Sequence, residues 1–241
     1  MSKIKANRYE NTATTDGGID IDSSGKVTFD GVNVGRGAGD VATNTVVGNN
    51  ALLANTTGAN NVAVGMEALD ANTSADNNTA VGYQSLTANT TGFSNSAVGK
   101  SALGSNTTGD KNVAVGHNAL VLSTTANENT ACGYQALFSN TTAGFNTAVG
   151  YEALTANTTG TSNTSTGWRS LNSNTTGGSN TSSGVNALQS NTTGSSNVAA
   201  GNGALLSNTT ASNNTAVGRN CLTANTAAGN TAVGASSLGT N

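Results

Sequence analysis

A glycine that returns every 17 residues is the feature that most constrains this chain. It follows a segment of the type Asn-Thr-Ala-Val and occurs twelve times, with spacings of 17 residues ten times in succession and 16 once. A fixed period of this kind is typical of stacked-repeat proteins, in which each unit buries its apolar face against its neighbours. The twelve positions are Gly48, Gly65, Gly82, Gly99, Gly116, Gly133, Gly150, Gly167, Gly184, Gly201, Gly218 and Gly234.

Positions in the repeat are numbered from this glycine, which is position 0. Leucine occupies position +4 in all twelve copies, and position +3 is Ala or Ser except at Cys221. Asparagine occupies position +7 in eleven copies, with Ser123 as the exception, and a second asparagine stands at position −4. The resulting consensus is N-T-A-V-G-x-x-A-L-x-x-N-T-T-G-x-x.

This composition favours β structure over helix. The 241 residues include 31 glycines and 37 asparagines but no proline; a helix loses about 1 kcal/mol for each glycine, whereas a proline would delete a hydrogen bond from a β ladder. We therefore predict an all-β solenoid with one coil per 17 residues and corners at which Asn and Gly adopt the left-handed conformation. Coils stacked about 4.8 Å apart would form a rod of roughly 55 Å, in which asparagine amides hydrogen-bond along the stack.

The predicted core is thin, with about one Leu, one Val and some Ala in each coil. The valine at position −1 is replaced in three consecutive copies by Thr166, Ser183 and Ala200. This leaves open whether the column is buried, partly wet or at a chain interface. A core this thin favours association of several chains along the rod. The two cysteines, Cys132 and Cys221, replace small apolar residues and are predicted to be buried thiols.

Charge and motif content exclude several classes of function. After residue 44 the only cations among Lys and Arg are Lys100, Lys111, Arg169 and Arg219, which is unlike a basic nucleic-acid-binding protein. No apolar run approaches the roughly 18 residues of a membrane helix, and no hydrophobic segment follows the charged N-terminus. The carboxylates form no recurring pair and His117 has no recognisable Ser or Cys partner. We expect no enzyme activity, cofactor, metal site, nucleic-acid partner or membrane insertion.

The N-terminal segment, residues 1–44, differs from the repeat region, residues 45–241. It holds eleven charged residues and lies outside the strict period. Two short β-like runs, GGIDID and GKVTFDGVNV, indicate a cap or an attachment region, and the sequence GRGAG at 35–39 is interpreted as a hinge.

The repeat units, most complete at 79–92 and 147–160, resemble the repeats of bacteriophage tail-fibre proteins. The opening MSKIKANRYEN…GGIDIDSSGKVTFDGV resembles the N-terminal attachment region of such fibres. The resemblance implies a homotrimeric virion component, made in the host cytoplasm and joined to a tail or baseplate protein through its N-terminal region. It further implies contact with a host surface polysaccharide or an outer-membrane component. Many such fibres carry a self-cleaving C-terminal chaperone domain; we expect this chain, ending in SSLGTN, to be cleaved, truncated or assembled otherwise.

Two alternatives remain. The repeat is also similar to the heads of trimeric bacterial surface adhesins, although the repeats of those proteins are shorter. A purely structural spacer, with a receptor-binding tip supplied by another protein, would have the same repeat.

Position +1 is the variable column and supplies most of the candidate receptor-binding residues. Its side chains differ so much in size and polarity that they cannot share one core slot, so we predict that they face solvent. Aromatic rings beside polar groups can bind sugars. The alternative is an exposed ladder that keeps the rod soluble or an inter-chain contact. The candidates, including one neighbour at position +2, are Tyr83, His117, Tyr134, Tyr151, Trp168 and Arg169.

Overall fold

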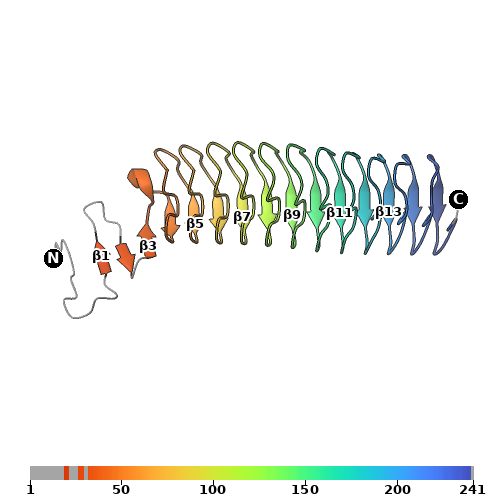
Figure 1. The fold of residues 1–241 in the computed structure, drawn as a ribbon, viewed down its shortest axis with the longest axis horizontal. Helices are drawn as coiled ribbons and strands as arrows, with labels where there is room; N and C mark the ends of the chain where they lie inside the picture. Colours follow the sequence, from red (N-terminus) through yellow and green to blue (C-terminus); the bar gives the residue numbers. More distant parts are fainter. Residues whose placement is uncertain (1–18, 22–26, 30–31, 240–241) are drawn as a thin grey trace.

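The chain forms a long, narrow β-solenoid (Figure 1). The computed structural model describes residues 19–21, 27–29 and 32–239. All fifteen strands belong to one sheet and follow one another in sequence order, so each coil pairs only with the coils before and after it. The predicted fold class, an all-β solenoid of 17-residue coils, is confirmed.

The sheet has two parts with different strand directions. The first three strands, β1 (Ile19–Ile21), β2 (Val27–Phe29) and β3 (Val32–Gly35), pair antiparallel, and β3 pairs antiparallel with β4. These strands coincide with the two β-like runs in the sequence. From β4 onward all pairing is parallel, through β4 (Thr45–Val47), β5 (Val62–Val64), β6 (Thr79–Val81), β7 (Ser96–Val98), β8 (Val113–Val115), β9 (Thr130–Cys132), β10 (Thr147–Val149), β11 (Thr164–Thr166), β12 (Thr181–Ser183), β13 (Val198–Ala200), β14 (Thr215–Val217) and β15 (Thr231–Val233).

Each coil contains one strand of only three residues, and turns form the rest of its circumference. The turns also hydrogen-bond to the neighbouring coil. The Leu137 N–H donates to the carbonyl of Ala153 at 3.1 Å, and the Thr158 N–H donates to that of Thr175 at 2.9 Å. The coils are therefore held together on every side, and not through the sheet alone.

The repeating glycine is required by both conformation and space. Its φ lies between 124° and 143° in all twelve copies, a region that other residues rarely adopt. A Cβ at Gly133 would also overlap the carbonyl oxygen of Gly150 in the next coil. Any side chain at this position would push two coils apart.

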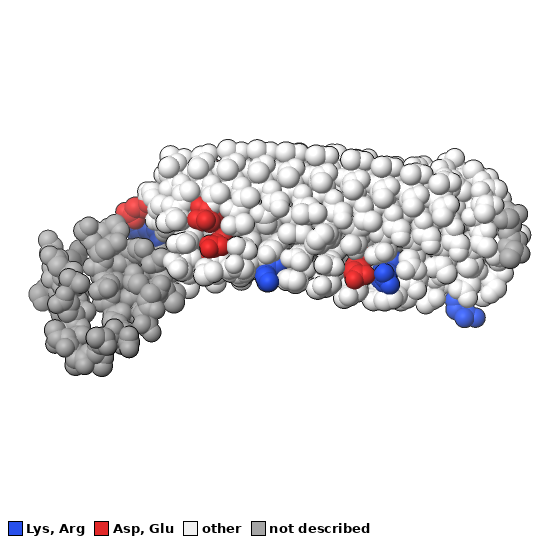
Figure 2. Space-filling view, in the orientation of Figure 1, with Lys and Arg blue, Asp and Glu red and all other residues white. Residues whose placement is uncertain are grey.

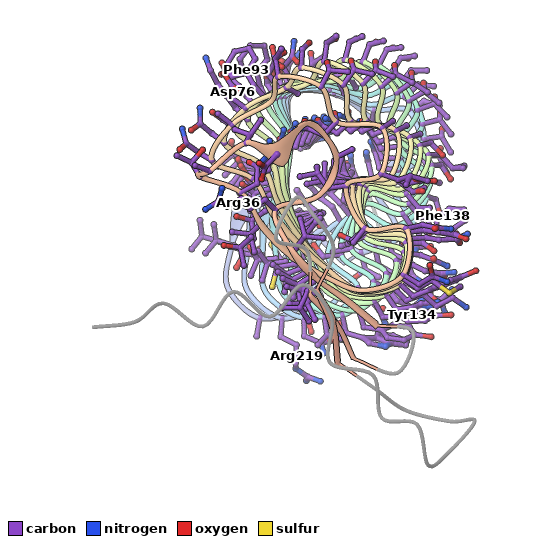
Figure 3. The ribbon with its side chains drawn as sticks, turned by 90° about the vertical axis from the view of Figure 1, so that its left-hand side faces the viewer. Arg36, Asp76, Phe93, Tyr134, Phe138 and Arg219 are labelled. Carbon is purple, nitrogen blue, oxygen red and sulfur yellow. The ribbon has the colours of Figure 1, made fainter. Side chains whose placement is uncertain are left out.

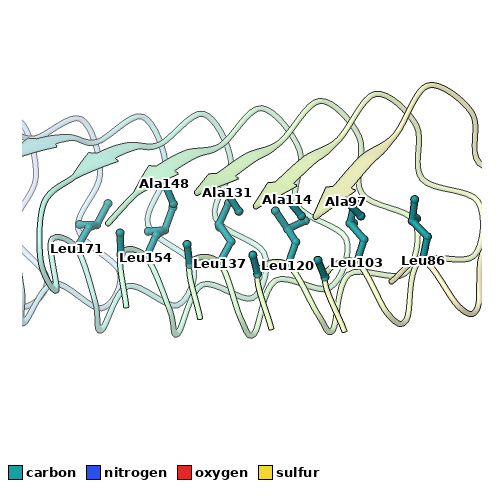
Figure 4. Close-up of a cluster of buried hydrophobic side chains, with 14 of the residues drawn as sticks. Leu86, Ala97, Leu103, Ala114, Leu120, Ala131, Leu137, Ala148, Leu154 and Leu171 are labelled. Carbon is teal, nitrogen blue, oxygen red and sulfur yellow. The ribbon is translucent and has the colours of Figure 1, made fainter. Parts of the chain in front are cut away.

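The core is a single file of leucines lined by alanines (Figure 4). The leucines at +4 from Leu52 to Leu222 are fully buried, as are the alanines at the centre of most strands. The prediction of one buried valine per coil is wrong. Strand side chains alternate between the two faces, so the residue at −2 points inward and the valine at −1 points outward. The leucine fills the narrow interior and leaves room only for a small residue opposite.

These leucines have φ between 47° and 54°, the left-handed region that costs about 1–2 kcal/mol for a residue with a side chain. Full burial of a leucine contributes about 1.5–3 kcal/mol, which offsets that cost. The expectation that the two recurrent asparagines adopt this conformation is wrong. None of the asparagines at −4 or +7 has positive φ, and the corners are turned by the residues at +2, +4 and +12.

Instead, the recurrent asparagines form two buried ladders along the rod. In the first asparagine ladder (position −4), the Asn78 side chain donates to the Gly92 carbonyl, and its Oδ1 accepts the Asn95 backbone N–H at 2.9 Å. In the second asparagine ladder (position +7), Asn89 Nδ2 donates to Asn72 Oδ1 at 3.2 Å and to the same Gly92 carbonyl. The predicted hydrogen bonding of amides along the stack is confirmed.

Buried hydroxyl and thiol groups at +3 have their own acceptors. Ser85 Oγ donates to the Ala97 carbonyl at 3.0 Å, Ser170 Oγ donates to the Ser182 carbonyl at 3.3 Å, and Cys221 Sγ contacts the Ala232 carbonyl at 3.2 Å. The prediction of a buried thiol is confirmed for Cys221. It is wrong for Cys132, which lies at −1 and is exposed.

The GRGAG segment does not behave as the predicted hinge. It leads into a short 3-10 helix, η1 (Ala38–Asp40), which lies against the first coil. The Ala38 N–H donates to the Leu52 carbonyl, and the Ala38 carbonyl accepts a hydrogen bond from Asn55. The segment therefore covers the start of the solenoid and leaves Leu52 fully buried.

Candidate functional site

The variable column at +1 faces outward, as predicted. Tyr83, Tyr134, Tyr151 and Trp168 keep 39%, 39%, 45% and 44% of their surface exposed, while His117 is half-buried. In the view along the rod, Tyr134 points away from the coil on the side opposite Phe93 (Figure 3). The sharp turn at the repeating glycine sends the side chain that follows it away from the interior.

Three of the candidates form a continuous stack over consecutive coils. The ring centroids of His117 and Tyr134 are 5.5 Å apart with an interplanar angle of 28°, and those of Tyr134 and Tyr151 are 5.1 Å apart with an angle of 11°. Both faces of the Tyr134 ring are therefore covered by its neighbours. This stack, His117–Tyr134–Tyr151, is called the aromatic ladder below.

The next coil continues the ladder with a different contact. The Arg169 guanidinium lies 5.3 Å from the centre of the Trp168 ring, within the range of a cation–π interaction. Arg169 Nε is also 3.1 Å from Glu152 Oε2 of the preceding coil. The structure thus brings Trp168, Arg169 and Glu152 together beside Tyr151.

Glu152 also affects the neighbouring phenol. Hydrogen bonding to Glu152 raises the pKa of Tyr151 above its ordinary value, and partial desolvation and the negative charge of Glu152 act in the same direction. The Tyr151 hydroxyl is therefore retained as a neutral group and is directed to a carboxylate. The candidate surface is amphipathic, with aromatic carbon beside hydroxyl, carboxylate and guanidinium groups.

Tyr83 stands apart from this group. It lies two coils before His117, with Lys100 between them in the column. Its neighbour Gln84 donates to Glu67 Oε2 at 2.8 Å, which repeats the pairing of polar side chains at +2 between adjacent coils. The structure therefore brings together five of the six predicted residues and leaves Tyr83 separate.

Sequence reasoning missed a second surface, the outward side of the parallel sheet. We define the strand face as the side chains at −3 and −1 of strands β4 to β15, from Thr45 to Val233. It contains only Thr, Val, Ser, Ala and Cys. The strict alternation of burial along each three-residue strand was the signal that could have revealed it.

Charge and metal-binding groups are sparse on the described part of the chain. Charged side chains are scattered over a largely uncharged surface (Figure 2). Residues 19–21, 27–29 and 32–239 contain no group of three His, Cys, Asp or Glu side chains placed to hold a metal ion. Within the same residues no helix is long and apolar enough to cross a membrane.

Comparisons with protein-family models, with curated proteins and with solved structures found no match for this chain.

Proposed function

We propose that this chain is a non-enzymatic tail-fibre component of a bacteriophage virion, which attaches to a host surface polysaccharide through repeated contacts along the rod. The observation that carries the proposal is the variable column at +1. On a scaffold whose other positions repeat, this outward column gathers His117, Tyr134, Tyr151 and Trp168 on adjacent coils.

The chemistry of this surface suits carbohydrate. The ring faces of Tyr134 are occupied by stacking, so a ligand would meet ring edges and phenol hydroxyls there. Glu152 and Arg169 add an acceptor and donors for sugar hydroxyls beside Trp168. Contacts of this kind are weak individually, and three parallel chains in one fibre would multiply them into avidity.

A structural spacer is the second candidate, and the mutual stacking favours it. Rings that cover one another stabilise the coil stack whether or not a ligand binds. The two functions differ in what loss of the rings does to attachment.

The test uses the triple variant Tyr134→Ala, Tyr151→Ala and Trp168→Ala, with Val185→Ala and Asn202→Ala of the same column as the matched control. We expect the triple variant to lose binding to a panel of bacterial surface polysaccharides and the control variant to retain it. Trp168 is the single tryptophan, so its fluorescence should shift on binding in the wild-type protein. Unchanged adsorption of the triple variant would refute the ladder as a binding surface and leave the spacer.

A further inference from the structure

The strand face is the longest uniform surface of the molecule. All ten charged residues of the repeat region lie at other positions of the repeat. The largest side chain on the strand face is valine, and several of these valines are well exposed: Val98, Val115, Val149 and Val217 are 38–40% exposed. An extended apolar surface with no charge is characteristic of a protein interface.

The size of the strand face fits an interface between chains. Twelve parallel strands each contribute two outward side chains, and half-exposed residues of this size give the face an area of roughly 1,000 Å². A standard interface buries about 800 Å² on each partner. A second copy of this chain has the same spacing between coils, so its rows of side chains can match these rows along the whole rod.

The narrowness of the face determines how many copies can meet. Each strand presents only the side chains at −3 and −1, so the surface is two residues wide. Three such surfaces can face one axis parallel to the rod, with the −3 column of each copy against the −1 column of the next. Rotation about such an axis keeps all copies parallel and at the same height.

The distribution of hydroxyl groups favours parallel association. Thr164, Thr166, Thr181 and Ser183 give the eighth and ninth coils two outward hydroxyls each. With equal coils side by side, these hydroxyls meet hydroxyls of the other copies. In a fully overlapped antiparallel pair, the eighth coil would meet Val113 and Val115 of the fifth and leave its hydroxyls without partners.

We propose that the strand face is the surface through which three copies of this chain associate, parallel and with equal coils at the same height. The proposal deepens the trimeric fibre proposed above, on which it rests, by identifying the contact surface. Receptor binding by the aromatic ladder involves other side chains, so the two proposals can fail separately.

The exposed Cys132 tests this arrangement in the unaltered chain, because it lies at −1 on β9 while Cys221 is buried. We expect native mass spectrometry to give the mass of three chains. A short bismaleimide should link two chains into a denaturation-resistant dimer, and Cys132→Ser should abolish the link. The mass of a single chain would overturn the proposal, as would a Cys132 that reacts with a bulky maleimide as fast as in the unfolded protein.

The direction of association is tested with Val64→Cys in the Cys132→Ser background. Parallel copies place position 64 of every chain at the same height, so we expect efficient cross-linking. Antiparallel copies would place these residues near opposite ends of the rod, and the absence of a link in an assembled protein would overturn the parallel arrangement.

The contact surface is tested with Val115→Arg, whose side chain points outward and would place guanidinium groups around the axis. We expect at least a tenfold rise in the concentration at which the assembly dissociates, with an unchanged circular dichroism spectrum. The matched control is Thr142→Arg, an exposed position outside the strand face. Equal assembly of Val115→Arg and the control would refute the interface.

Discussion

The two asparagine ladders differ in continuity. The first ladder is unbroken, because each Oδ1 from Asn44 to Asn214 accepts the backbone N–H of the next asparagine. The second is interrupted at Ser123, whose side chain is too short to reach the coils on either side. Asn106 Oδ1 and Ser123 Oγ are both buried without a hydrogen-bond partner. The contrast shows that an asparagine in this fold serves two coils at once, so that one substitution leaves polar atoms unpaired in its neighbour.

The largest effect is expected from breaking the first ladder. Asn146→Ala removes the donor to the Gly160 carbonyl and the acceptor of the Asn163 backbone N–H at 2.9 Å. Because each buried group left unsatisfied costs about 1–3 kcal/mol, we expect a loss of about 3 kcal/mol in the free energy of unfolding. Urea denaturation followed by circular dichroism measures the loss. Asn202→Ala, at an exposed position, should change the free energy by less than about 0.5 kcal/mol; similar losses for both variants would contradict the role of the ladder.

A second interruption tests whether the gap at Ser123 is costly. Asn157→Ser copies that gap and removes the hydrogen bond from Asn157 Nδ2 to Asn140 Oδ1 at 2.9 Å. We expect a loss of about 1–3 kcal/mol, and faster hydrogen exchange confined to the adjacent coils, as in other repeat proteins. Uniform exchange along the rod would contradict a local effect.

Repairing the gap should have the opposite sign. Ser123→Asn supplies a donor to Asn106 Oδ1 and an acceptor for Asn140, and should raise the free energy of unfolding by about 1–2 kcal/mol. Ser123→Ala is the control, since the hydroxyl that it removes has no partner, and it should be close to neutral. A destabilised Ser123→Asn protein would show that this corner cannot accommodate the longer side chain.

The smallest effect is expected at Cys221, whose thiol already has an acceptor. Cys221→Ser retains a donor to the Ala232 carbonyl and reproduces the arrangement of Ser85 and Ser170 in the same column. We expect a change below about 0.5 kcal/mol in thermal or urea unfolding. A large loss would mean that the size of the sulfur atom, and not its hydrogen bond, matters at this position.

The sequence was sufficient to predict the coils, the buried leucine column and the asparagine ladders, because each depends on a residue type that repeats at a fixed spacing. The direction of the strands was misjudged. Hydrophobicity favoured burial of the valine, whereas the width of the interior, already filled by Leu137 and its equivalents, admits only alanine opposite. The outward aromatic column followed from its variability. The stacking of Tyr134 between His117 and Tyr151 depends on ring orientation, which spacing does not specify.

The single coil of 16 residues has a consequence for the length of the chain. Between Gly218 and Gly234, Thr215 still pairs with Thr231 and Asn230 still donates to Asn214 Oδ1, so the missing residue disturbs neither strand nor ladder. The change is absorbed at the corner after Asn225, whose side chain donates to Ala227 two residues later instead of three. This corner is therefore the natural insertion point of the solenoid, where a foreign loop can be displayed without altering the rod beneath it.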